Sequence, residues 1–318
     1  MNLQESLDKR PAVQRPHRVI ALLNESSGTT AGKKRDELHG ELQAAFERHG
    51  ITARIDFFPG TLLLRAAEEA LSKAKSGECD AVIAGGGDGS IRTVASVLAH
   101  SGVPLGVLPL GTLNHFAKDL KVPLAIPEAV ATIAAGKTRA IDVACANGRV
   151  FINNSSIGIY PSLVLDRERR RRDQHMPKWL AMGFAGVRMV RDLPMRRLTI
   201  STPEGEQVYR SSCVFIGNNV YELKGFALGS RERLSQGKLC LYVAKQDNSR
   251  RLIWLAAKSV FKLIDPERDL RSMITTEIKI QSRHKRLLVS FDGEVELMQM
   301  PLHYTIKPGA LRVFQPDA

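Results

Sequence analysis

Residues 79–99 read CDAVIAGGGDGSIRTVASVLA and decide the fold of the first half of the chain. An apolar run leads into four glycines and one acid within residues 85–90, and a helix-like stretch follows. This order predicts a buried strand, a tight turn and a helix N-terminus, whose backbone amides bind phosphate. A turn that uses glycine only for its backbone angles is the weaker interpretation.

Two familiar phosphate-binding motifs do not fit this turn. The chain contains no G-x-x-x-x-G-K-[ST], and a dinucleotide fingerprint would require glycine at the position of Ser90. Asp88 is also unusual, because a carboxylate repels a bare pyrophosphate. A divalent cation beside it, or a hydroxyl that needs activation, would explain its presence.

Two further turns follow strand-like runs in the same way. PLGTLNHFA at residues 109–117 follows one apolar run, and NESSG at residues 24–28 ends another. The carboxyl ends of neighbouring parallel strands meet at one edge of a sheet, so three such turns would line one crevice.

Strand-like and helix-like segments alternate from residue 18 to residue 135, which predicts a parallel sheet covered by helices. After Asp142 strand-like pieces dominate, interrupted by helical stretches at about 176–191 and 250–263, so a second, β-rich domain is expected. A length of 318 residues suits two domains. We therefore expect a flexible leader at 1–16, a nucleotide-binding α/β domain at 17–141 and a β-rich domain at 142–304.

The formal net charge of +13 favours an anionic partner. Ten basic and four acidic residues fall between residues 163 and 197, although a solvated face is the usual meaning of such a run. The four cysteines are far apart and form no C-x-x-C pair, which predicts neither a disulfide framework nor a zinc site and points to a reducing cytoplasm. No apolar run reaches the roughly 18 residues of a spanning helix, so any membrane contact should be peripheral.

Several motifs in order resemble the catalytic domain of the bacterial diacylglycerol kinase family, which also includes sphingosine and ceramide kinases. They are GGDGS at 86–90, PLGTLNHFA at 109–117, the Asn24 loop, IDV at 141–143, N-x-x-S-x-G at 153–158 and the sequence Asp292-Gly293-Glu294. The resemblance covers about residues 17–316. GGDG alone is shared with NAD kinases, whereas the ordered set is specific.

The resemblance implies an NAD kinase-like α/β domain, a sandwich-like β-rich domain, an active site between them, and a tail (about 305–318) that returns to the first domain. It implies ATP and Mg²⁺ as cofactors, with Asp88 near the metal. The implied cofactor-binding residues are Asn24, Gly28, Gly85, Gly86, Gly87, Asp88, Gly89, Ser90, Gly111, Thr112 and Asn114. Asp292, Glu294 and Asp88 are the implied catalytic residues, one of them the general base, although a lone Asp-Gly more often marks a hairpin turn.

The sequence also departs from the family pattern. Many relatives carry a glycine and an acid where this chain has Leu113 and His115, and we expect a structural role for His115. Some bacterial relatives hold a structural magnesium through an acid at the position of Gln236. Glutamine is a poor magnesium ligand, which argues against that second metal site.

The predicted function is an ATP-dependent kinase that phosphorylates a lipid hydroxyl, with diacylglycerol converted to phosphatidic acid. The alternatives are an NAD kinase, a sphingoid or other lipid kinase, and a membrane-binding regulator without activity. We expect a cytoplasmic protein at the inner membrane face, with no nucleic acid partner; a homodimer is left open. The expected membrane-surface residues are Arg167, Arg169, Arg170, Arg171, Arg172 and Trp179, although the segment around Trp179 could equally pack on its own domain.

Overall fold

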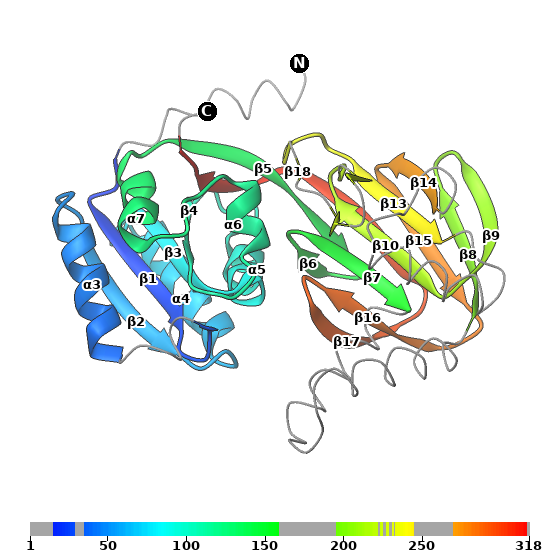
Figure 1. The fold of residues 1–318 in the computed structure, drawn as a ribbon, viewed down its shortest axis with the longest axis horizontal. Helices are drawn as coiled ribbons and strands as arrows, with labels where there is room; N and C mark the ends of the chain where they lie inside the picture. Colours follow the sequence, from blue (N-terminus) through cyan, green and yellow to red (C-terminus); the bar gives the residue numbers. More distant parts are fainter. Residues whose placement is uncertain are drawn as a thin grey trace. The chain divides into compact units, whose positions relative to one another are not determined.

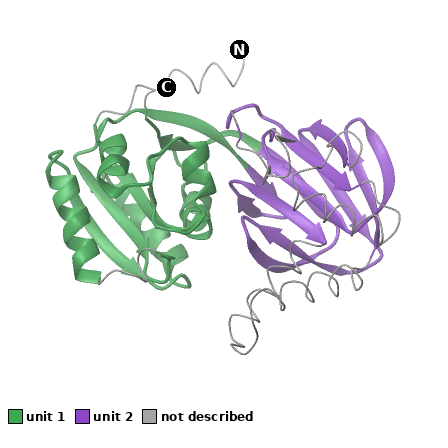
Figure 2. Cartoon of the chain, viewed as in Figure 1, with its two compact units in different colours: residues 1–143, 307–318 green, residues 144–306 purple. Residues whose placement is uncertain are grey.

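The computed structural model describes residues 15–28, 35–158, 195–221, 223–224, 227–228, 231, 233–244 and 270–316. The chain forms two compact units (Figure 2): unit 1 comprises residues 1–143 and 307–318, and unit 2 comprises residues 144–306. Most of the predicted leader, the basic run at 167–172 with Trp179, and the two helical stretches predicted after residue 142 lie outside the described residues.

Unit 1 is built on parallel strands in the order β2-β1-β3-β4 (Figure 1). These strands are β1 (Arg18–Asn24), β2 (Thr52–Phe58), β3 (Ala81–Gly86) and β4 (Leu105–Pro109). The helices are α3 (Arg35–Glu47), α4 (Leu63–Lys75), α5 (Asp88–Leu98), α6 (His115–Asp119) and α7 (Ile126–Ala134). Every residue of β3 is buried, as expected of a central parallel strand covered on both faces.

Unit 2 consists mainly of antiparallel strands. One sheet has the order β14 (Leu270–Thr275), β13 (Leu239–Ala244), β10 (Cys213–Asn218), β7 (Asn154–Gly158), β16 (Arg286–Phe291) and β17 (Glu294–Gln299). The remaining strands are β6 (Arg149–Phe151), β8 (Arg196–Thr202), β9 (Gly205–Ser211), β15 (Glu277–Ser282), β18 (Leu302–Phe314), and the short pair β11 (Leu223–Lys224) and β12 (Ala227–Leu228). Strand β5 (Thr138–Ala146) begins in unit 1 and ends in unit 2. Apolar side chains from both groups of strands share one buried core.

Strand β18 contributes to both units. Its residues 302–305 pair with β15 in unit 2, and Val313 pairs with Leu105 of β4 in unit 1. In unit 1 the Gly309 N–H also donates to the Asp142 carboxylate at 2.8 Å. The predicted fold class, a parallel α/β domain followed by a strand-rich domain, is confirmed.

The structure corrects one boundary that matters for the site. The sequence pattern places the helix after residues 85–90, whereas α5 begins within them, at Asp88. Gly87 has an extended backbone (φ −84°, ψ 178°) and is the N-cap residue, and the helical conformation begins at the next residue. Asp88 therefore occupies the first helical position instead of the turn.

The aromatic core of unit 2 supports a stability prediction. The Phe151 ring is fully buried, with ring centroids 5.9 Å from Phe291 and 6.1 Å from Tyr304. Replacing Phe151 with alanine should lower the free energy of unfolding by about 3–5 kcal/mol, because the lost contacts leave a cavity. Hydrogen exchange of the β7 and β16 amides under increasing urea measures the change.

Val208→Ala provides the control, since that side chain on β9 is 53% exposed and should change stability by less than about 0.5 kcal/mol. Equal losses in the two variants would contradict the assignment of the core.

Candidate functional site

Three strands of unit 1 bring the predicted nucleotide-binding turns to one edge of the sheet. Leu23 of β1 pairs with Gly85 of β3, and Gly86 pairs with Pro109 of β4. The turns that follow these three strands therefore begin side by side. This juxtaposition is what the alternating sequence pattern predicts for parallel strands.

The two glycine-rich turns touch at their backbones. A Cβ atom at Gly111 would overlap the Cα of Gly87, and one at Gly85 would overlap the Leu23 side chain. A Cβ at Gly28 would lie 3.2 Å from the Thr112 hydroxyl, which places the first loop against the third turn. At Gly111 glycine allows a contact between two backbones that a side chain would prevent, whereas at Gly85 and Gly28 the nearest neighbours are side chains.

Asn114 stabilises the turn after β4 through hydrogen bonds to the backbone of that turn. It is 5% exposed and adopts a left-handed conformation (φ 50°, ψ 46°), which asparagine tolerates better than most residues. Its Oδ1 accepts from the Gly111 N–H at 3.0 Å, while its Nδ2 donates to the carbonyls of Pro109 and Gly111 at 3.1 and 2.8 Å. The shape of this turn therefore depends on one buried amide.

Asp88 links the turn after β3 to the turn after β4. Its carboxylate accepts hydrogen bonds from the backbone N–H groups of His115 and Phe116, at 3.1 and 2.8 Å. These amides open α6 and have no partner within that helix. Asp88 thus holds the starts of α5 and α6 together, and the sequence gives no sign of this positioning role. His115 takes part through its backbone, and its side chain is exposed.

The start of α5 offers amides to an anion. Its N-cap residue is Gly87, and no side chain caps the helix. The first amides of an 11-residue helix lack intrahelical acceptors and carry positive potential. Asn24 borders them, because its Nδ2 donates to the Ser90 hydroxyl at 2.8 Å while its Oδ1 accepts from the Ser26 N–H at 3.0 Å.

In unit 2, Asp292 lies at a two-residue hairpin turn between β16 and β17. Asp292 and Gly293 both have positive φ, 49° and 91°, as a type I′ turn requires. The Asp292 carboxylate accepts from three consecutive backbone N–H groups, those of Ile152, Asn153 and Asn154, at 2.9, 2.7 and 3.0 Å. Asp292 therefore anchors the 152–154 turn.

Arg231, which sequence reasoning missed, also holds this turn. Its guanidinium is buried and donates to the Ile152 carbonyl at 2.6 Å, the Asn218 carbonyl at 3.0 Å and the Asn153 Oδ1 at 2.7 Å. It also lies 5.3 Å from the centroid of the Tyr221 ring. A single arginine among charged residues carries no recognisable signal in the sequence, so only the fold reveals it.

Glu294 is the exposed carboxylate of this region and begins β17. Its neighbour Glu296 forms two hydrogen bonds with Arg149, at 2.7 and 2.6 Å. These bonds are the main reason that the pKa of Arg149 is raised, and the charge of Glu294 adds to the effect. Glu294 therefore lies close enough to Arg149 for their charges to interact.

Gln236 forms hydrogen bonds with other residues of the same chain. The Gln236 side chain accepts from the Val220 N–H at 3.1 Å, and the Gln236 N–H donates to the Asn219 Oδ1 at 2.9 Å. Within the described ranges, no group of three or more histidine, cysteine or acidic residues could hold a metal ion. The same residues contain no helix long and apolar enough to cross a membrane.

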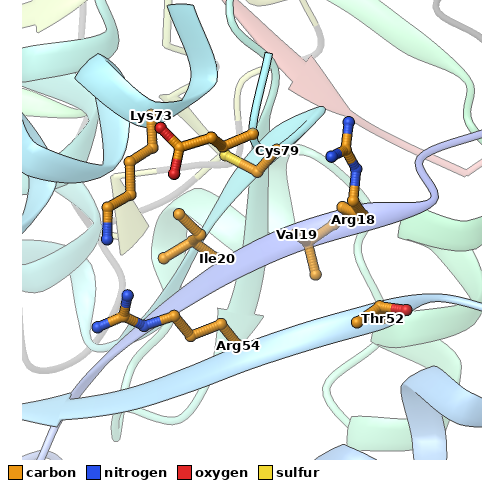
Figure 3. A pocket seen from close by; sticks show the side chains of 8 residues that line it. Arg18, Val19, Ile20, Thr52, Arg54, Lys73 and Cys79 are labelled. Atoms are coloured by element: carbon orange, nitrogen blue, oxygen red, sulfur yellow. The ribbon is translucent and has the colours of Figure 1, made fainter. Parts of the chain in front are cut away.

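A hollow of about 180 Å³ lies at the opposite edge of the parallel sheet (Figure 3). Its lining includes Arg18 and Thr52, the first residues of β1 and β2, so it opens at the amino ends of the strands. Arg54, Lys73 and Cys79 also line it, and none of the predicted site residues does. We place the candidate site at the glycine turns, where the predicted nucleotide-binding residues lie, and not at this hollow.

The structure thus groups the predicted residues in two places. Unit 1 brings together Asn24, the 85–90 turn and the 111–114 turn, and unit 2 brings Asp292 and Glu294 to one hairpin. That these two groups share one active site stays a prediction.

Comparison with known proteins identifies the family. Residues 18–146 match the family model of the diacylglycerol kinase catalytic domain. A diacylglycerol kinase of Mycobacterium tuberculosis is 30% identical over 312 residues, which span 94% of this chain and 95% of that protein. An uncharacterised Synechocystis protein is 26% identical over 251 residues, and the match spans 77% of this chain and 57% of that protein.

Solved structures share the fold. The crystal structure of a diacylglycerol kinase from Bacillus anthracis has a TM-score of 0.69 at 18% identity, covering 95% of this chain and 98% of that one. Yeast NADH kinase, complexed with NADH, has a TM-score of 0.54 at 10% identity, covering 96% and 85%. The fold is therefore that of the diacylglycerol and NAD kinases. The chain belongs to the diacylglycerol kinase family, and it is a kinase.

The two hairpin carboxylates should respond differently to neutralisation. Asp292→Asn leaves one acceptor oxygen and turns an N–H₂ group toward backbone N–H donors, so unfolding of unit 2 should become easier by about 2–3 kcal/mol. Glu294→Gln alters an exposed side chain and should change stability by less than about 0.5 kcal/mol. Urea denaturation with hydrogen exchange of the 152–154 amides measures both. If Asp292→Asn were as stable as Glu294→Gln, the anchoring role of Asp292 would be wrong.

Proposed function

We propose that this kinase transfers the γ-phosphoryl group of ATP, bound with Mg²⁺, to a lipid hydroxyl, with diacylglycerol as the first candidate acceptor and phosphatidic acid as the product. One observation supports the phosphate site above all others. The turns at 85–90 and 111–114 form a cradle free of side chains at Gly87 and Gly111, beside the uncapped start of α5. Backbone amides in such a cradle can approach phosphate oxygens closely.

The residues present fit a nucleotide phosphate chain. The first amides of α5 would bind phosphate oxygens, and Asn24 and Thr112 would border them from the neighbouring turns. A bound magnesium ion would neutralise the phosphate charge that develops in phosphoryl transfer. It would also offset the repulsion between those phosphates and the Asp88 carboxylate.

Glu294 is the better candidate for the general base. Three backbone N–H groups already donate to the two carboxylate oxygens of Asp292, which makes that residue an anchor. Glu294, two residues later, is exposed. In the proposed reaction, the lipid hydroxyl oxygen forms a bond to the γ-phosphorus while the bond to the bridging β–γ oxygen breaks. The hydroxyl proton passes to the Glu294 carboxylate.

The assay uses the purified full chain, labelled ATP, magnesium and a panel of diacylglycerol, ceramide, a sphingoid base and phosphatidylglycerol, with NAD as a separate acceptor. Labelled phosphatidic acid is the expected product. A labelled sphingoid base or ceramide would move the proposal to another lipid. Phosphorylation of NAD alone, or of nothing in the panel, would overturn it.

Replacing Glu294 with glutamine should separate chemistry from binding. We expect kcat to fall by about 10²–10⁴-fold, because the proton acceptor is lost, while the KM for ATP stays within about twofold. Glu69→Gln on the exposed face of α4 removes an equal charge and should leave both constants unchanged. An unaltered kcat in the Glu294 variant would remove this residue from the mechanism.

A further inference from the structure

A dense group of cations lies at one end of the unit 2 strands. The turn between β15 and β16 carries Arg283, His284 and Lys285, and Arg286 begins β16. All four side chains are exposed. The Met300 N–H donates to the Lys285 carbonyl at 2.9 Å, which ties this turn to the one between β17 and β18.

Two more arginines reach the same end. Strand β8 pairs with β15 so that Leu198 lies opposite Ser282, the last residue before the basic turn. The preceding residue, Arg197, is exposed and lies directly opposite Arg210 of β9. Like charges in opposed positions destabilise a sheet, so this arrangement has a cost that an anionic partner would offset.

We call this surface the basic end; it consists of Arg197, Arg210, Arg283, Lys285 and Arg286. The ion pairs that Arg54, Arg65, Arg149 and His303 form in the described part of the chain involve no residue of the basic end. The positive charge of the basic end is therefore available to an external anion.

Apolar groups flank these cations. A hollow of about 280 Å³ lies between the basic turn and the pair Met300 and Pro301. On the neighbouring strands Leu288 and Leu297 pair with each other, and their side chains are 37% and 58% exposed. Leu288 is two residues from Arg286, so cationic and apolar side chains adjoin. Such a combination suits the boundary between lipid headgroups and acyl chains.

The described strands to which segments 159–194 and 245–269 are attached end or begin at this same end. Strand β7 stops at Gly158, which pairs with Cys213, and β13 stops at Ala244, which pairs with Leu270. The adjoining segment 159–194 carries eight basic and four acidic residues, and segment 245–269 carries six and four. Both segments thus have a net positive charge, and their points of attachment adjoin the basic end.

We propose that the basic end docks this kinase on the surface of an anionic phospholipid bilayer. Cations near such a surface are attracted to its negative potential, and exposed leucines can enter the interface. The flanking side chains are leucine and methionine and not the aromatic rings on which nucleic acid bases stack, which favours lipid over nucleic acid. The biological meaning of the proposal rests on the proposed lipid kinase function, but docking itself requires no nucleotide.

The test measures binding of the full chain to phosphatidylcholine vesicles with and without phosphatidylglycerol, in the absence of ATP. The triple variant Arg283→Gln, Lys285→Gln and Arg286→Gln should bind the anionic vesicles roughly 100-fold more weakly than the unaltered chain. A matched triple, Arg233→Gln, Lys238→Gln and Lys279→Gln, removes the same charge from exposed positions of unit 2 outside the basic end. It should weaken binding by no more than about threefold.

A second variant tests the apolar part. Leu288→Ser with Leu297→Ser should weaken binding several-fold while the salt dependence stays unchanged, because the charges remain. Equal losses in the two glutamine triples would show that only net charge matters and would overturn the proposal. So would a basic-end triple that binds vesicles normally but loses affinity for single-stranded RNA.

Turnover on detergent-dispersed diacylglycerol separates the two proposals. If the chain phosphorylates this lipid yet the basic-end triple binds vesicles like the unaltered chain, docking at this surface is wrong and the kinase function stands. If the chain phosphorylates no lipid but binds anionic vesicles through the basic end, docking stands and the proposed function fails.

Discussion

The structure of the candidate nucleotide site depends on the contact between two glycine backbones, those of Gly87 and Gly111. This contact lets the turns after β3 and β4 merge into one surface lined by amides. Two polar side chains maintain it: Asn114 closes its own turn from within, and the Asp88 carboxylate reaches from the start of α5 to the first amides of α6. A side chain at Gly111 would push the turns apart, because its Cβ would overlap the Gly87 Cα.

Unit 2 uses its polar side chains in a comparable way. Asp292 and Arg231 both hold the 152–154 turn, Asp292 by accepting from its N–H groups and Arg231 by donating to a carbonyl and an amide side chain. Groups with several hydrogen bonds to the backbone give rigidity, whereas proton transfer requires an accessible group. Asp292 is therefore assigned an anchoring role, and the exposed Glu294 is the proposed proton acceptor.

Much of this arrangement can be predicted from sequence, because it is local. Alternating strands and helices give the parallel sheet, and glycines that follow apolar runs mark the turns at its edge. Asp88 shows the limit of this reasoning: its type and place suggested a metal or a hydroxyl, while its observed partners are amides 27 and 28 residues away. Arg231 could not be found at all, since its partners come from β7, β10 and their loops, and no spacing in the sequence encodes such contacts. The basic end likewise forms only when β8 pairs with β9 and β15 and the turn between β15 and β16 is in place.

Equilibrium titration of the full chain with ATP and magnesium tests the central claim most directly, with Gly111→Ala compared with Gly40→Ala. The methyl group at residue 111 would overlap Gly87, whereas at residue 40 on α3 nothing lies within 4 Å. We expect Gly111→Ala to weaken ATP binding by at least about tenfold, equivalent to roughly 1.4 kcal/mol, while Gly40→Ala binds ATP like the unaltered chain. Equal ATP affinity in both variants, with both folded, would show that the glycine contact does not form the phosphate site.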